Sequence, residues 1–183
     1  CTEPIAVAYA AAVARQTLGE LPDKVIVGAS GSIIKNVKSV IVPNTDNMKG
    51  LNTAAAAGIV AGKPEKELEV TAEVTPEQTE ALKEFLKTAE ITVEHVENGN
   101  TFDIVISVFK GEKSAKVRIA NYHTNIVYIE KNGEVLKNIP VRGEAEDGLT
   151  DRNLLNMKDI WDFANTVDIE DVRPILEPRI RYN

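Results

Sequence analysis

The sequence predicts an α+β fold, in which buried alanine-rich helices pack on a mixed or antiparallel sheet and a further helical segment follows. Three observations lead to this prediction. The first helix-length segment is apolar on nearly every face, which is typical of a helix buried between neighbours. From Ile91 onwards, apolar residues recur at every second position, the period of a strand. After Leu149 the period is again that of a helix, so strands and helices fall in separate runs, as in α+β proteins.

The first predicted helix runs from Thr2 to Leu18. We expect Thr2 to cap it, because a threonine oxygen can accept from the free N–H groups of the first turn. Pro4 is tolerated in that turn, and Gly19 is a typical residue at the end of a helix. The small side chains of the helix allow close packing of its neighbours.

Two strands and a second small-residue helix are predicted next. The strands cover 24–29 and 37–42, and the polar segment 30–36 joins them as a loop. Segment 43–47, Pro-Asn-Thr-Asp-Asn, has the composition of a turn. The helix covers 51–61, and the glycine that follows ends it.

The next predicted helix begins at Thr75, where the pattern Thr-Pro-Glu-Gln is that of a capping box. One face of this helix is apolar, with Leu82, Phe85, Leu86 and Ala89.

An antiparallel meander is predicted after this helix. Its alternating segments are 91–96, 102–108, 115–119, 126–129 and 135–136. Asn132-Gly133 is a signal for a type I′ hairpin turn between the last two.

The C-terminal region is predicted to be helical over Leu149–Val167, and again from Asp168 to about Ile180, where Pro174 and Pro178 interrupt the helix. The predicted core face of the first of these helices consists of Leu154, Leu155, Met157, Ile160, Trp161 and Ala164. The chain thus divides into regions 1–74, 75–148 and 149–183, an organisation that is also compatible with one compact domain.

Composition excludes several classes of function. A net charge of −7 argues against nucleic acid or an anionic membrane as a partner, because both require a cationic surface. The longest apolar stretch, Ile5–Ala14, is too short to span a bilayer, and we find no secretory signal. A single cysteine cannot form an intramolecular disulfide, which predicts a cytoplasmic location. Because the chain begins with Cys1, we expect either a fragment or a processed product.

Cys1 is the first candidate for chemistry. A thiol beside the N-terminus of a helix is favoured as the thiolate, the form that binds metal or accepts a proton. The alternative is a small side chain buried for packing alone.

Two polar segments are the other candidates. Ser30, Ser32, Lys35 and Asn36 offer hydroxyl, ammonium and amide groups that suit a small carboxylate ligand, although a plain hairpin loop has the same composition. The segment His123–Asn125 opens a strand, where the histidine can shuttle a proton or bind a carboxylate. Its alternative is a polar strand entry. His95 alternates with apolar positions of a strand, and we assign it no role.

Cys1-Thr2-Glu3-Pro4 resembles the CTEP motif of the iron–sulfur L-cysteine desulfidases, relatives of the α region of bacterial iron–sulfur L-serine dehydratases. Further segments resemble that family in the same order: Lys35-Asn36, Val42-Pro43, the run AAAAGIVAG at 54–62, His123-Thr124-Asn125-Ile126-Val127 and Trp161–Ala164. The resemblance therefore spans nearly the whole chain.

The resemblance implies a lyase that removes sulfide and ammonia from L-cysteine, or water and ammonia from L-serine, leaving pyruvate. The family uses a four-iron–four-sulfur cluster, and its other cluster cysteines lie in a C-terminal half that this chain lacks. The resemblance therefore implies that this chain alone binds no cluster and is inactive, with the missing half as partner and a homo-oligomer possible.

Specific roles follow from the same resemblance. Cys1 is either a cluster ligand or the base that removes the α-proton, and His123 is the second catalytic candidate. The residues predicted to bind the substrate are Ser30, Ser32, Lys35, Asn36, Thr124 and Asn125.

The sequence also departs from the family pattern, which leaves the substrate open between cysteine, serine and another compound. Ser32 replaces an asparagine, 37–39 replaces a glycine-rich stretch, Asn44 replaces a glycine, and Tyr122 replaces a small residue. Two other classes of function therefore stay open. One is an N-terminal-nucleophile hydrolase that uses Cys1 with its own α-amine as base. The other is a non-catalytic domain that binds a small molecule.

Overall fold

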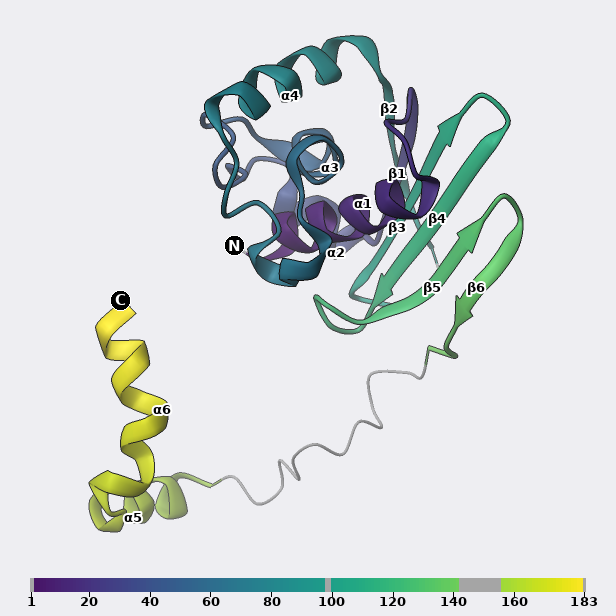
Figure 1. Ribbon diagram of the computed structural model, residues 1–183. Coiled ribbons are helices and arrows are strands. Elements are labelled where there is room, and N and C mark those ends of the chain that lie inside the picture. The colour runs from purple at the N-terminus through teal and green to yellow at the C-terminus, as the bar shows by residue number, and fades with distance from the viewer. Residues whose placement is uncertain (1, 98–99, 142–155, 183) are drawn as a thin grey trace. The chain divides into compact units, whose positions relative to one another are not determined.

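The computed structural model describes residues 2–97, 100–141 and 156–182 (Figure 1). They divide into two units, residues 1–144 and residues 145–183. Among the described helices, none combines the length and the apolar character needed to cross a membrane. The α+β fold class predicted from the sequence is confirmed.

Helix α1, Glu3–Leu18, is the central helix of the first unit. Every residue from Pro4 to Ala14 is buried, as predicted for a helix that is apolar all round. Gly19 ends the helix with a left-handed φ of 92°, and its N–H donates to the carbonyl of Arg15. The predicted cap at Thr2 is wrong, because Thr2 has helical backbone angles and its side chain accepts no bond from the first turn.

The sheet of the first unit is mixed. Its strands are β1 Lys24–Ala29, β2 Glu90–His95, β3 Asp103–Lys110, β4 Lys113–Ala120, β5 Ile126–Lys131 and β6 Glu134–Asn138. The spatial order is β2-β1-β3-β4-β5-β6, with β1 parallel to β2 and every other neighbouring pair antiparallel. Asn132 and Gly133 have φ of 51° and 83°, which confirms the I′ signal between β5 and β6.

The predicted meander therefore holds for β3 to β6 and is wrong for segment 91–96. That segment forms β2, which pairs with the much earlier strand β1 instead of with β3. A crossover of four helical elements, α2, α3, η1 and α4, separates β1 from β2, and such a crossover can return the chain parallel to the strand it left.

The second predicted strand, 37–42, and the loop 30–36 before it are both wrong. Helix α2, Gly31–Val37, occupies this segment. Ile33 and Val37, four residues apart, are both buried, so the apolar spacing is that of a helix. Ile41 forms only an isolated bridge with Lys49. The polar residues Ser32, Lys35 and Asn36 are typical of a hairpin loop in sequence, but in the structure they form the exposed face of α2.

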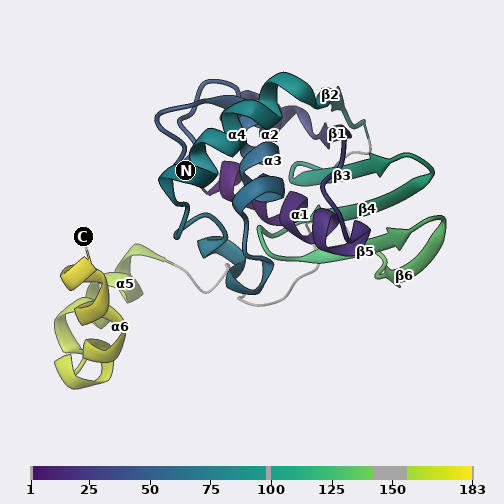
Figure 2. The same cartoon turned by 45° about the horizontal axis from the view of Figure 1, so that its top comes forward.

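The remaining helices of the first unit are α3 Gly50–Ala61, the 3-10 helix η1 Pro64–Glu69 and α4 Pro76–Thr88. The predicted capping box is confirmed, because the Gln78 N–H donates to Thr75 Oγ1 and the Thr75 N–H donates to Gln78 Oε1. Helix α1 packs on β3, β4 and β5, and α3 packs on both α1 and α4. Figure 2 shows these helices on the same side of the sheet.

The second unit contains α5, Met157–Thr166, and α6, Ile169–Tyr182. Helix α6 is continuous through Pro174 and Pro178, so the predicted interruption is wrong. Each proline removes one N–H donor, but its fixed φ is helical. The predicted core face of α5 is also wrong in its described part, because Met157, Ile160, Trp161 and Ala164 are exposed. Leu154 and Leu155 lie outside the described residues.

Substituting Gly58 by alanine is expected to destabilise the fold, because an added Cβ would lie 2.0 Å from the carbonyl oxygen of Ala8 on the facing helix. We expect the free energy of unfolding to fall by about 3 kcal/mol, since the backbones of α1 and α3 must separate. Denaturant unfolding measures this loss. Asn52→Ala, at an exposed position of the same helix, is the control and should change stability by less than about 0.5 kcal/mol. Equal stability of the two variants would contradict the close crossing.

Candidate functional site

Two of the segments that carry predicted site residues, Ser30 and the loop before β5, lie at one end of the sheet. Ala29 pairs with Ile104, Asp103 with Ala120, and Ile119 with Ile126. The ends of β1 and β4 therefore lie beside the starts of β3 and β5, at one end of the strands. We call this end of the sheet the site end, and it carries Ser30, residues 101–102 and the loop 121–125.

The first turn of α1 and helix α2 also meet. Helix α1 and strand β1 run in opposite directions, so the start of α1 and the end of β1 lie on the same side of the unit (Figure 1). The Asn36 side-chain amide donates to Glu3 Oε1 at 3.3 Å. This bond joins the Cys-Thr-Glu-Pro segment to the Lys-Asn segment, which are 33 positions apart. Cys1 itself lies outside the described residues.

Helix α2 presents one polar face. Ser32, Lys35 and Asn36 are all exposed, and their spacing of three and four residues places them on the same side of the helix. Ile33 and Val37 anchor the opposite side in the core. Hydroxyl, ammonium and amide groups therefore face solvent together, next to the first turn of α1.

Ser30 has a local structural role. Its side chain is buried, its hydroxyl donates to the carbonyl of Thr101 at 2.6 Å, and its N–H donates to the carbonyl of Asp103 at 2.9 Å. Both donors of Ser30 therefore fix the start of α2 to the start of β3. The structure does not place this hydroxyl on the same exposed surface as Ser32.

The loop 121–125 holds His123 half-buried. Its ring contacts that of Phe102, with centroids 4.6 Å apart and planes tilted by 59°. Asn125 closes the loop, because its side-chain amide donates to the carbonyl of Ala120 at 2.9 Å. Thr124 is half-buried between them. His123 is thus connected to the start of α2 through Phe102, Thr101 and Ser30.

A shallow hollow of about 500 Å³ adjoins Ser30 at the same end of the sheet. His95 lies on its wall, and its Nδ1 is 3.5 Å from Glu97 Oε1. Sequence reasoning gave His95 no role and missed this position, because only the parallel pairing of Ala29 with His95 brings the two segments together. The spacing of residues within β2 does not indicate which strand pairs with it.

A buried ion pair fixes β3 to β4 at the site end. Asp103 is fully buried and accepts hydrogen bonds from Arg118 Nε at 3.0 Å and from the Asn100 side-chain amide at 3.0 Å. A third bond from Arg118 Nη2 makes the pair bidentate. Hydrogen bonding to Asp103 raises the pKa of Arg118, so the guanidinium stays charged at neutral pH.

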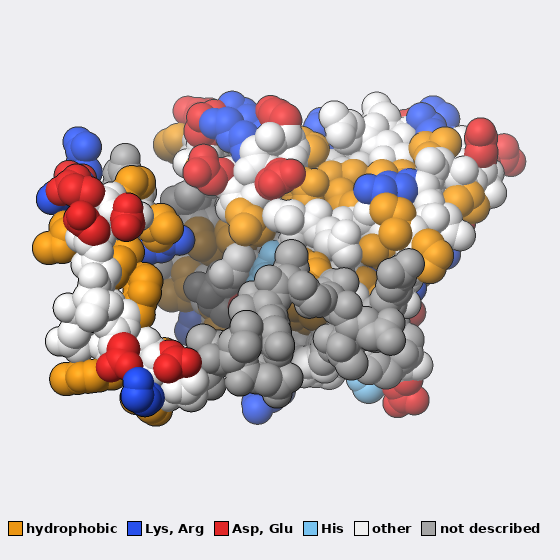
Figure 3. All heavy atoms as spheres, turned by 90° about the horizontal axis from the view of Figure 1, so that it is seen from below, with side chains coloured by type: hydrophobic (Ala, Val, Ile, Leu, Met, Phe, Trp, Pro, Cys, Tyr) orange, Lys and Arg blue, Asp and Glu red, His pale blue; other side chains and the backbone are white. Residues whose placement is uncertain are grey.

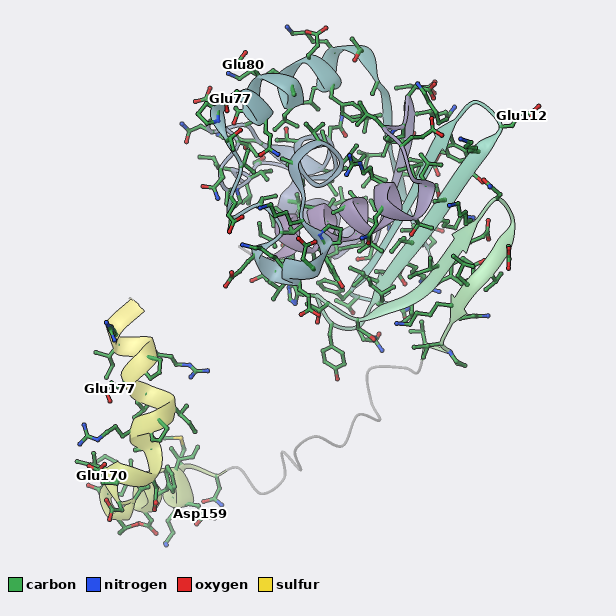
Figure 4. The ribbon with its side chains drawn as sticks, in the orientation of Figure 1. Glu77, Glu80, Glu112, Asp159, Glu170 and Glu177 are labelled. Atoms are coloured by element: carbon green, nitrogen blue, oxygen red, sulfur yellow. The ribbon has the colours of Figure 1, made fainter. Side chains whose placement is uncertain are left out.

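The residues present do not make a complete iron–sulfur site. The chain has one cysteine, whereas a four-iron–four-sulfur cluster is held by several thiolates. Within the described ranges, no three His, Cys, Asp or Glu side chains gather closely enough to hold a metal ion. Figure 4 shows Glu77 and Glu80 on α4, and Glu112 at the β3–β4 turn, extending outward away from the site end.

Two departures from the family pattern have local explanations. Asn44 has a left-handed φ of 59°, a conformation that asparagine shares with the expected glycine, and its side-chain amide donates to the carbonyl of Thr71. Tyr122 is 46% exposed, so its ring does not fill the interior of the site end.

Comparison with known proteins matches the whole chain to part of longer proteins. The chain is 49% identical over 183 residues to a UPF0597 protein of Desulfitobacterium hafniense, covering 100% of this chain and 43% of the relative. It is 44% identical to one of Lachnoclostridium phytofermentans, covering all of this chain and 44% of the relative, and 41% identical to one of Treponema denticola, with 100% and 43% covered. The chain thus spans less than half the length of these relatives. No protein-family model matches the chain, and no solved structure does.

Replacing Asp103 by asparagine should destabilise the site end, because it leaves Arg118 partly buried without its carboxylate. We expect a loss of about 2–3 kcal/mol in the free energy of unfolding. The control is Glu90→Gln, which removes the exposed ion pair with Lys24 and should cost less than about 1 kcal/mol. Similar losses in the two variants would show that the buried pair contributes no more than a surface pair.

Proposed function

We propose that this chain is the part of an iron–sulfur-dependent lyase that supplies the substrate-facing residues for α,β-elimination of L-cysteine or L-serine. The hydrogen bond between Asn36 and Glu3 carries the proposal. It supports the view that motifs widely separated in the sequence belong to one site. The register of β3, β4 and β5 puts the His-Thr-Asn loop at the same end of the sheet.

Elimination requires that the substrate carboxylate is held and that the α-proton is removed. In our proposal the polar face of α2 holds the carboxylate, with Lys35 as the cation and Asn36 as a further donor. Asn36 donates to Glu3 with one N–H, which leaves its second N–H for the ligand. A charge-assisted bond of this kind sets the orientation of a small amino acid.

His123 is proposed to hold or move a proton. Imidazole changes its charge near neutral pH, so it suits proton transfer to or from the substrate. Its ring packs on Phe102, which restricts its orientation while leaving the side chain half-exposed. Cys1 is proposed as the base or as a cluster ligand, and both roles stay open.

This chain supplies at most one of the thiolates that hold an iron–sulfur cluster. We propose that the other ligands belong to the part of the longer proteins that this chain does not span. The exposed polar face of α2 fits this view, since catalytic elimination benefits from a site closed to water. The chain alone is therefore proposed to be inactive.

His123→Gln should lower kcat by at least about 100-fold, because glutamine retains a polar side chain but cannot transfer a proton at neutral pH. The measurement uses the longer protein that contains this chain, reconstituted anaerobically with iron and sulfide, and follows pyruvate released from L-cysteine and L-serine. Unchanged kcat in this variant would refute the role of His123. Full turnover by Cys1→Ala would likewise refute both roles of the thiol.

Lys35→Met should raise KM about 10- to 100-fold and change kcat less, because it removes a charge-assisted hydrogen bond to the substrate carboxylate. Lys116→Met is the matched control, since Lys116 is exposed in the middle of β4 and pairs with Ser107 and Glu130. Equal KM in both variants would contradict the carboxylate site. Failure of the reconstituted protein to release pyruvate from either amino acid would overturn the lyase proposal itself.

A further inference from the structure

Helices α5 and α6 expose a concentration of large apolar side chains. Trp161 is 70% exposed and Met157 79% exposed on α5, and Ile180 is 78% exposed on α6. Figure 3 shows hydrophobic side chains on the outside of this unit. We define the α5–α6 apolar surface by the residues Met157, Ile160, Trp161, Ile169, Leu176 and Ile180.

The spacing of these residues is that of helices built to pack against something. On α5, Met157, Ile160 and Trp161 are three and four residues apart, and polar residues such as Lys158 and Asp162 lie on the other side, joined by an ion pair. On α6, Leu176 and Ile180 are four residues apart. Amphipathic stripes of this kind are a signature of burial.

The second unit has no core of its own within its described residues. No residue from 156 to 181 is buried. Helices of 10 and 14 residues are marginal in water without tertiary packing, even for good helix formers. The two helices therefore require another surface to be stable, and the apolar side chains are the part of them that burial would stabilise.

The comparisons identify what could supply that surface. The relatives match this chain along its full length, so they contain a counterpart of α5 and α6. More than half of each relative has no counterpart in this chain. The described residues of α5 and α6 form no core, and the longer relatives contain much additional protein that could cover the two helices.

We propose that the α5–α6 apolar surface is the docking surface for the part of the longer protein that this chain does not span. The occupant is thus protein from the same polypeptide, with an apolar surface complementary to Trp161 and its neighbours. The proposal concerns assembly and holds independently of the lyase reaction.

Trp161 provides the test, because it is the only tryptophan of the 183 residues. Iodide quenching of its fluorescence is measured in the 183-residue chain and in the longer protein that contains it. For the longer protein, the emission of its Trp161→Phe variant is subtracted, so that the emission of Trp161 alone remains. We expect strong quenching in the chain, and several-fold weaker quenching with blue-shifted emission in the longer protein.

Three results would overturn the proposal. Equal quenching in both proteins would mean that the additional part does not cover Trp161. Shielding in the monomeric 183-residue chain would mean that residues of this chain cover it. Shielding that grows with chain concentration, together with a dimer in sedimentation, would identify a second copy as the occupant.

A pair of charge variants tests the same surface without tryptophan fluorescence. Trp161→Glu should lower the melting temperature of the longer protein, because it places a carboxylate in an apolar interface, and should leave that of the 183-residue chain unchanged. Lys158→Glu adds a carboxylate on the polar side of the same helix and should have little effect in either protein. Equal effects of both variants in the longer protein would contradict a buried α5–α6 apolar surface.

Discussion

The close crossing of α1 and α3 is the contact on which the rest of the first unit depends. Gly58 lies so close to the backbone of Ala8 that a residue with a Cβ atom does not fit at position 58. Helix α1 is thereby held between α3 and the sheet. A helix that is buried on all sides cannot rotate or slide without losing contacts on one of them. The first turn of α1 is therefore fixed in place, and the Glu3–Asn36 bond is a consequence of that position.

This constraint relates the architecture to the candidate site. The sheet brings the starts and ends of four strands to the site end, and the first turn of α1 is bonded to α2, the helix that follows β1. The side chains at that edge have two kinds of role. Ser30, Asp103 and Arg118 are occupied in holding the strands and α2 together. Lys35 and Asn36 face solvent, so they are the groups available to a ligand.

Much of the fold was predictable from sequence, because much of it is local. Helix α1 followed from its apolar run, α4 from its capping box, and the β5–β6 hairpin from Asn132-Gly133. The errors lie where long-range packing decides. A short polar segment with Ile33 and Val37 fits a loop and strand as well as a helix, until the core shows that both side chains point inward.

The candidate site, too, was only partly predictable from the sequence. Its residue types were recognisable from sequence, but their grouping was not, since it depends on the order of strands in the sheet. The parallel pairing that places His95 beside Ala29 leaves no periodic signal in either segment. Likewise, the apolar residues of α5 were predicted to form a core face, but in the described part of that unit they are exposed.

The position of β1 has a consequence for how the chain folds during synthesis. This strand lies between β2 and β3, so Lys24 is paired with Glu90 on one side and Phe109 on the other. Both partners leave the ribosome long after β1, and such distant pairings form slowly. Until they arrive, the nascent chain displays an unpaired apolar strand beside an alanine-rich helix.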